Sequence, residues 1–135
     1  MSVSANWDSD AKRIIRYDFE GHWTWEQFRT AANEAFALTR SVEYRVDTIS
    51  NFLPGADLPP NALFQFNRIM KNAPPNRGIV VIVGGTMFIN NLVSMFTTVY
   101  KALGQKIKIA PTLDEARKIL TELSPVETAS TVIAV

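Results

Sequence analysis

Few side chains of this chain could perform acid–base or nucleophilic chemistry. His22 is the only histidine and there is no cysteine, which excludes disulfides, thiol catalysis and thiolate metal sites and leaves only an all-oxygen metal site. A Ser-His-Asp triad would have to use His22, and the sequence contains no Gly-x-Ser-x-Gly nucleophile elbow. Because His22 stands between Gly21 and a helix cap, we interpret it as a polar residue at the end of a strand. No nucleophile, base and orienting group can be named together, so we predict no enzymatic activity, no metal and no cofactor.

Three aspartates can be compared with the acid cluster of a response-regulator receiver: Asp47, Asp57 and Asp114. A receiver places two acidic residues directly after its first strand and a lysine after its last strand. This chain has no matching aspartate pair, and Pro111-Thr112 occupies the place of the lysine. We therefore expect Asp47 to be a hydrogen-bonding strand or loop residue. Asp114 is expected in the first turn of a helix, where the helix dipole favours a negative charge.

One glycine turn stands where a phosphate could bind. Gly84-Gly85-Thr86 follows a predicted buried strand and opens a predicted helix, and helix N-termini bind anions. Neither the dinucleotide fingerprint nor a P-loop is present. Both motifs need a later glycine that this stretch lacks, and the lysine that a P-loop requires does not follow. A tight turn is the favoured interpretation, and an anion site is the alternative.

The segment Gly78–Gly104 is the expected centre of the fold. Ile79–Val83 contains only β-branched residues, which is the composition of a strand buried on both faces. The uncharged run Ile79–Tyr100 is long enough to cross a bilayer. The two glycines, Asn90-Asn91 and the change to a helical period instead favour a strand followed by a buried helix.

This predicted helix carries more apolar surface than one face of a sheet can cover. In addition to its sheet-facing stripe, Phe88, Ile89, Val93 and Tyr100 leave few polar positions for a side that faces water. A neighbouring helix, a second subunit or an apolar ligand could cover this surface. We favour a homodimer through these residues.

Strands and helices alternate along the rest of the chain. Two short strands, Ser2–Asp8 and Arg13–Glu20, predict a hairpin. Thr24 and Gln27 form a capping box for a helix that runs to about Arg40, with Trp23 and Phe28 at the hydrophobic-staple positions. The later elements are a strand over Tyr44–Phe52, a helix from Pro59-Pro60 to about Ala73, a strand over Lys106–Ala110, and a last helix from Thr112 to Leu123.

This order predicts an α/β domain over residues 1–124. The expected sheet is mixed and has about five strands, an opening antiparallel hairpin followed by βα units, together with about four helices. The tail 125–135 could form an edge strand, pair with another chain or be disordered.

Parallel strands would bring several polar residues to one edge of the sheet. The strand ends at Asn51–Asp57, Gly84–Thr86 and Ala110–Thr112 are expected to gather where ligands bind in open α/β sheets. The candidate binding residues are Asp47, Ser50, Asn51, Asp57, Asn61, Gly84, Gly85 and Thr86.

Three stretches carry a resemblance to a known family. RYDFEGHWTWEQF, RVDTISNF and PPNAL together resemble the SpoIIAA-like (STAS/SEC14-type) proteins of bacteria. The order of elements, a hairpin, a helix, and then a strand running into a loop and a helix, is similar to that of STAS domains, which include the anti-sigma-factor antagonists. The resemblance covers about Trp7 to Leu123. It implies a STAS-like α/β fold and a protein-interaction or ligand-sensing module that is not an enzyme.

The chain departs from the family at its regulatory motif. Sigma-regulating antagonists carry Asp-Ser-Ser-Gly at the start of the second helix, where the serine is phosphorylated. The corresponding stretch, Asp57-Leu58-Pro59-Pro60-Asn61, has no serine or threonine. Ser50 lies upstream and is a poor substitute, so the resemblance does not carry phosphorylation over to this position.

The composition limits the partners to consider. Of 135 residues, 47% are hydrophobic and 20% charged, and the net charge of +1 provides no bulk attraction to nucleic acid or anionic membrane. Met1–Asp10 is polar and does not resemble a secretory signal, so we expect a cytoplasmic protein. The expected function is a regulatory domain that binds a protein partner around Asn51–Asn61. The alternative is a carrier of a small apolar molecule or lipid, as the SEC14-type resemblance implies.

Overall fold

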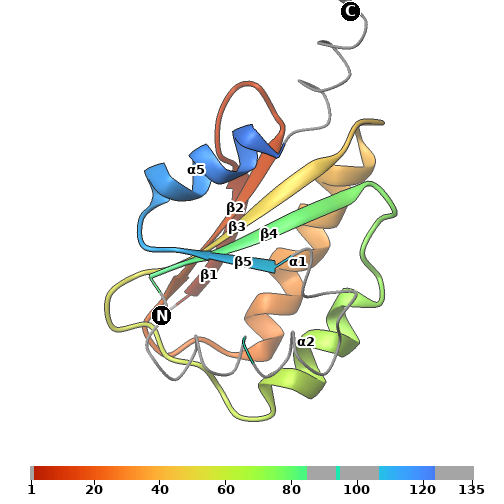
Figure 1. The fold of residues 1–135 in the computed structure, drawn as a ribbon. Helices are drawn as coiled ribbons and strands as arrows, with labels where there is room; N and C mark the ends of the chain where they lie inside the picture. Colours follow the sequence, from red (N-terminus) through yellow and green to blue (C-terminus); the bar gives the residue numbers. More distant parts are fainter. Residues whose placement is uncertain (1, 85–93, 95–106, 124–135) are drawn as a thin grey trace, which may run out of the picture.

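A computed structural model of the chain describes residues 2–84, 94 and 107–123, and its centre is a five-stranded sheet (Figure 1). The strands are β1 (Ser2–Trp7), β2 (Ile14–Glu20), β3 (Val46–Phe52), β4 (Arg77–Val83) and β5 (Ile107–Ala110), in this order across the sheet. β1 is antiparallel to β2, and all later neighbours are parallel. The helices are α1 (Trp25–Arg40), α2 (Ala62–Met70) and α5 (Leu113–Glu122). The predicted α/β class, with an antiparallel hairpin that opens a mostly parallel sheet, is confirmed.

The helices cover both faces of the sheet. α1 and α2 lie on one face and α5 lies on the other (Figure 1). The first face is rich in aromatic side chains, and Phe19 of β2 stacks on Phe52 of β3 with ring centroids 4.4 Å apart. On the second face Ile49 and Val81 pack against Ala116 and Leu120 of α5, and all four are buried. Two cores therefore share one sheet, because alternate residues of each strand point to opposite faces.

Local sequence signals explain where α1 begins. The Thr24 hydroxyl accepts a hydrogen bond from the Gln27 N–H (3.1 Å), and the Gln27 side chain accepts one from the Thr24 N–H (3.0 Å). The Trp23 and Phe28 rings meet edge-on, with centroids 6.1 Å apart. The predicted capping box and hydrophobic staple are both confirmed.

Some predicted boundaries and one count are wrong. The described residues contain three helices rather than about four. Of the helix expected after Gly85, only Ser94 is described, and it is helical. The second helix spans Ala62–Met70, not Pro59-Pro60 to Ala73, because Asn61 adopts a left-handed conformation with φ of 62° directly before it. β3 begins at Val46 rather than Tyr44.

A bulge in β4 lies beside Asp47 of β3. Val46 pairs with Arg77 and Thr48 pairs with Val80, so β4 has one extra residue between the two pairs. The Asp47 carboxylate accepts the Ile79 N–H at 2.8 Å, which satisfies a donor that the bulge removes from the ladder. Asp47 is thus a hydrogen-bonding strand residue, as predicted.

Within the described ranges, no helix is long and apolar enough to cross a membrane. Ile79–Val83, which begins the uncharged run considered for a membrane span, is part of β4. Most of the remaining run is outside the described ranges.

Candidate functional site

The parallel strands β2 to β5 end along one edge of the sheet, as predicted. Asn51 of β3 pairs with Val83 of β4, and Val83 pairs with Ala110 of β5. On the other side, Phe19 of β2 pairs with Phe52 of β3. We call the ends of these four strands and the residues that follow them the carboxyl edge. Ligands of open α/β sheets usually bind at such an edge.

The loop after β3 is held in place by two tryptophans, Trp23 just before α1 and Trp25 at its first position. The Trp23 indole N–H donates to the backbone carbonyl of Asp57 at 2.7 Å, and the Trp25 indole N–H donates to the carbonyl of Pro60 at 2.8 Å. The Asp57 N–H also donates to the Gly21 carbonyl at 3.2 Å. The path of this loop is therefore set by contacts to a segment more than thirty residues away in sequence.

Asp57 and His22 meet at the carboxyl edge. The His22 Nδ1 atom contacts one carboxylate oxygen of Asp57, and both side chains are exposed. The other carboxylate oxygen, Oδ1, is buried and has no hydrogen-bond partner within the described residues. With Nδ1 directed at Asp57, Nε2 is the ring's second hydrogen-bonding position. The pair can form hydrogen bonds with a bound group, and it does not by itself constitute a nucleophile.

The contact between His22 and Asp57 was not predicted from the sequence. His22 follows β2 by two residues, and Asp57 lies in the loop that follows β3. Since β2 and β3 are parallel neighbours, their ends share the edge. From that adjacency, His22 could have been predicted to lie at the candidate site.

Helix α2 begins next to this loop and exposes an aromatic side chain. Phe64 is 66% exposed, the highest of the large hydrophobic residues in the described parts of the chain. The preceding Asn61 is exposed and makes no side-chain cap. Asp57, Asn61 and Phe64 thus form one continuous stretch of chain at the carboxyl edge, which we call the loop–α2 surface.

Gly84 is required at the carboxyl edge for conformational reasons. Its φ is 74°, and a Cβ placed there would lie 2.4 Å from the backbone carbonyl oxygen of Phe52. These observations support the tight-turn interpretation of this glycine. Gly85 and Thr86, the other two residues of the candidate turn, lie beyond the described residues.

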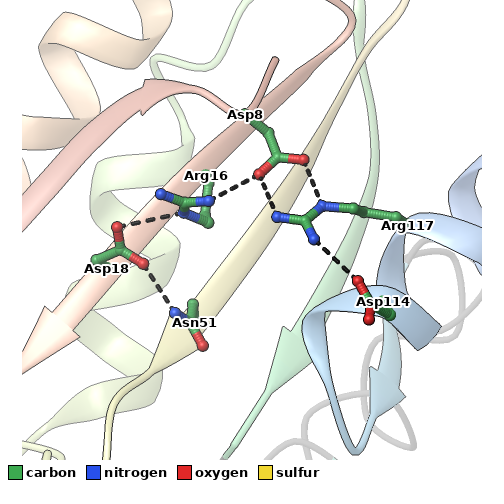
Figure 2. A network of polar contacts seen from close by, with 6 residues as sticks. All are labelled: Asp8, Arg16, Asp18, Asn51, Asp114 and Arg117. Carbon is green, nitrogen blue, oxygen red and sulfur yellow. Dashed lines mark hydrogen bonds and ion pairs between the residues drawn. The ribbon is translucent and has the colours of Figure 1, made fainter.

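Asn51 belongs to a polar network rather than to an open site. Figure 2 shows this network along the face of the sheet that α5 partly covers. The Asn51 Nδ2 donates to Asp18 at 2.8 Å, and Arg16 joins Asp18 to Asp8 through contacts of 3.2 and 2.9 Å. Because Asn51 is buried and partnered, we assign it a structural role.

Asp8 connects this network to α5. Arg117 of α5 donates to both Asp8 carboxylate oxygens, at 2.8 and 3.0 Å, and also to Asp114 at 3.1 Å (Figure 2). The Asp8 side chain is only 3% exposed. Hydrogen bonding to Arg117 and the positive charges of Arg117 and Arg16 outweigh desolvation and lower the pKa of Asp8. The network fixes α5 against the opening hairpin.

Asp47 does not lie at the carboxyl edge, so its placement among the edge residues was wrong. It is the second residue of β3 and therefore lies near the opposite ends of the parallel strands. There it pairs with Arg45, with a nitrogen–oxygen distance of 3.0 Å. Burial raises the pKa of Asp47, and the Ile79 N–H and Arg45 oppose that shift.

Ser50 points away from Asn51, towards α1 and α2. It lines a cavity between the sheet and these helices, together with Thr48 of the same strand. The single expected cluster is thus divided. Asp57, Asn61 and Gly84 lie at the carboxyl edge, Asn51 joins a buried network, Ser50 lines a cavity, and Asp47 lies near the other end of its strand.

The residues predicted to form a homodimer interface, Phe88, Ile89, Val93 and Tyr100, are outside the described ranges, so this hypothesis remains a prediction. In the part of the chain that the structure describes, no three acidic or histidine side chains cluster as metal ligands would.

Comparisons with protein-family models and with curated proteins found no match to this chain.

Proposed function

We propose that this chain is a STAS-like regulatory domain that acts in the cytoplasm without catalysis and binds a protein partner through the loop–α2 surface. The observation that carries the proposal is Phe64, an aromatic ring 66% exposed on α2 directly after the anchored loop. Aromatic side chains are enriched at the centres of protein interfaces, where they contribute much of the binding energy. A loop that is already ordered loses little conformational entropy when it binds.

Polar groups at the carboxyl edge suit the rim of such an interface. His22 and Asp57 are exposed and can form hydrogen bonds with a partner at the border of the apolar contact. The helix begins after Asn61 and has no hydroxyl at its cap. Binding in this proposal is therefore not controlled by phosphorylation at the position that sigma-regulating antagonists use.

A carrier of lipids or apolar molecules is less well supported. One cavity lined by described residues, between the sheet and helices α1 and α2, has a volume of about 20 Å³. Pockets for drug-sized ligands are usually about 300–1,000 Å³. The lining would have to move apart considerably before it could accept an acyl chain.

The test compares proteins captured from a lysate of the source cells by the wild type and by a Phe64→Ser variant. The matched control is Leu123→Ser, because Leu123 is also a partly exposed hydrophobic residue but lies at the end of α5. We expect a partner that the wild type and the control retain and that Phe64→Ser loses. Affinity for the isolated partner should fall by about 30-fold or more, as for an interface hot spot.

Two results would contradict the proposal. One is a partner bound equally by the wild type and Phe64→Ser. The other is co-purification of only lipids or small molecules, detected by mass spectrometry of extracted ligand, which would favour the carrier.

A further inference from the structure

The cavity between the sheet and helices α1 and α2 has a mostly apolar lining that includes several hydroxyl groups and one charged side chain. Its volume of about 20 Å³ gives room for one or two molecules of the size of water. Arg77 of β4 supplies the charge, and Tyr17, Thr48 and Ser50 of the neighbouring strands supply hydroxyl groups. The rest of the lining is Ile15, Ala35, Phe36, Thr39, Phe66, Met70 and Val80.

The lining contains no carboxylate to neutralise Arg77. Asp47, which is close in the sheet, lies next to the β4 bulge and is paired with Arg45. Burial lowers the pKa of Arg77, and Tyr17 is the titratable group that opposes this shift. A partly buried guanidinium without a counter-charge is costly, and the cost falls when an anion reaches it.

Tyr17 cannot serve as the counter-charge near neutral pH. Burial raises the pKa of its phenol well above the ordinary value of 10.0, although the charge of Arg77 acts in the opposite direction. The group therefore remains a neutral hydroxyl, which can donate a hydrogen bond. Thr39, the other hydroxyl in the lining, already donates to the Ala35 carbonyl at 2.8 Å.

We propose that this cavity binds a small monovalent anion, of the size of chloride or of one carboxylate group, held by Arg77 and by the hydroxyls of Tyr17, Thr48 and Ser50. Arginine supplies several directed N–H donors to an anion, and hydroxyl groups can turn their hydrogens towards it. The site joins β2, β3 and β4 to the helices above them, and it is separate from the loop–α2 surface. It could therefore exist whether or not that surface binds a protein.

In the experiment the protein is titrated with sodium chloride, and binding is monitored by the excess linewidth of the chlorine nuclear magnetic resonance signal. The variant is Arg77→Gln, and the matched control is Arg68→Gln, which removes an exposed arginine from α2. We expect excess broadening with the wild type and the control, and loss of most of it with Arg77→Gln. Competition by sodium formate would show that the site accepts a carboxylate; failure of formate to compete would restrict it to halide.

Tyr17→Phe provides a second variant that retains the ring packed on Phe28 at 5.4 Å between centroids. Loss of one hydrogen bond to a charged group should weaken chloride binding by about tenfold or more. The proposal is overturned if the wild type causes no excess broadening, in which case the cavity contains only water. It is equally overturned if Arg77→Gln broadens the line as the wild type does. If circular dichroism shows that Arg77→Gln does not fold, the proposal is tested with Tyr17→Phe and Ser50→Ala instead. Unchanged chloride affinity in both of these variants would overturn the proposal.

Discussion

Replacing Asp8 by asparagine removes the negative charge that holds α5 to the opening hairpin. Asp8 receives three hydrogen bonds of 2.8 to 3.0 Å from the guanidinium groups of Arg16 and Arg117. Loss of one partner from a fully buried pair costs about 3–5 kcal/mol, whereas an exposed pair contributes only about 0.2–1 kcal/mol. The Asp8 side chain is 3% exposed but its two arginines are 31% and 38% exposed, so water can partly solvate them in the variant. We therefore expect Asp8→Asn to lower the free energy of unfolding by about 2 kcal/mol at pH 7, between these limits.

The pH dependence supplies a second readout of the same contact. The pKa of Asp8 is lowered from 3.8 in the folded protein, so its stabilising effect is present above 3.8 and is lost as the pH falls through the folded-state pKa. The difference between wild type and Asp8→Asn, measured by urea unfolding, should be largest near neutral pH and should shrink under acid conditions.

Asp114→Asn is the control for this experiment. Asp114 contacts the same Arg117, but its side chain is 96% exposed. We expect a change below about 0.5 kcal/mol for this variant. An equally small change for Asp8→Asn at pH 7, or a difference that does not vary with pH, would refute the assignment of Asp8 as the residue that fixes α5.

Three further predictions follow from other contacts, and a fourth from the sequence. Gly84→Ala should lower the free energy of unfolding by more than about 1 kcal/mol, because it forces a Cβ against the Phe52 carbonyl at positive φ; an unchanged melting temperature would contradict this. Asn76→Ala should lower the free energy of unfolding, measured with urea, by about 2 kcal/mol, because the two N–H groups of the Asn76 amide are shared among three carbonyls at 2.9 to 3.1 Å, at the end of α1 and after it. A loss below about 0.5 kcal/mol would be too small for that role. The pKa of Asp47 is raised above 3.8, so the stability that this group contributes is lost as the pH rises through its folded-state pKa. Over that range the free energy of unfolding of Asp47→Asn should rise relative to that of the wild type. A difference in the free energy of unfolding that does not vary with pH would contradict this. Size-exclusion chromatography with light scattering should give the mass of two chains, whereas a single-chain mass at high concentration would reject the predicted homodimer.

The loop anchored by tryptophans shows how far local signals reach. The capping box and staple of α1 could be predicted from the sequence, because all four residues lie in the first turn of the helix or directly before it. The proline–glycine composition also identified the loop after β3. The hydrogen bonds by which Trp23 and Trp25 hold this loop could not be predicted from local sequence, because each joins residues 34 or 35 positions apart. The α2 boundary was missed because the left-handed backbone of Asn61 places the start of the helix after both prolines.

The sequence alone determined the α/β class, the opening hairpin, α1 and the buried strand β4, because hydrophobic period and caps act over a few neighbouring residues. It also included Asp57, Asn61 and Gly84 among the candidate residues of the carboxyl edge, but not His22. Only the tertiary structure decided where they act. Register and the alternation of side chains direct Ser50 into the cavity and Asn51 into the opposite network, although they are adjacent in the chain. The same long-range packing brings Arg117 to Asp8 across 109 positions, a contact that no local pattern encodes.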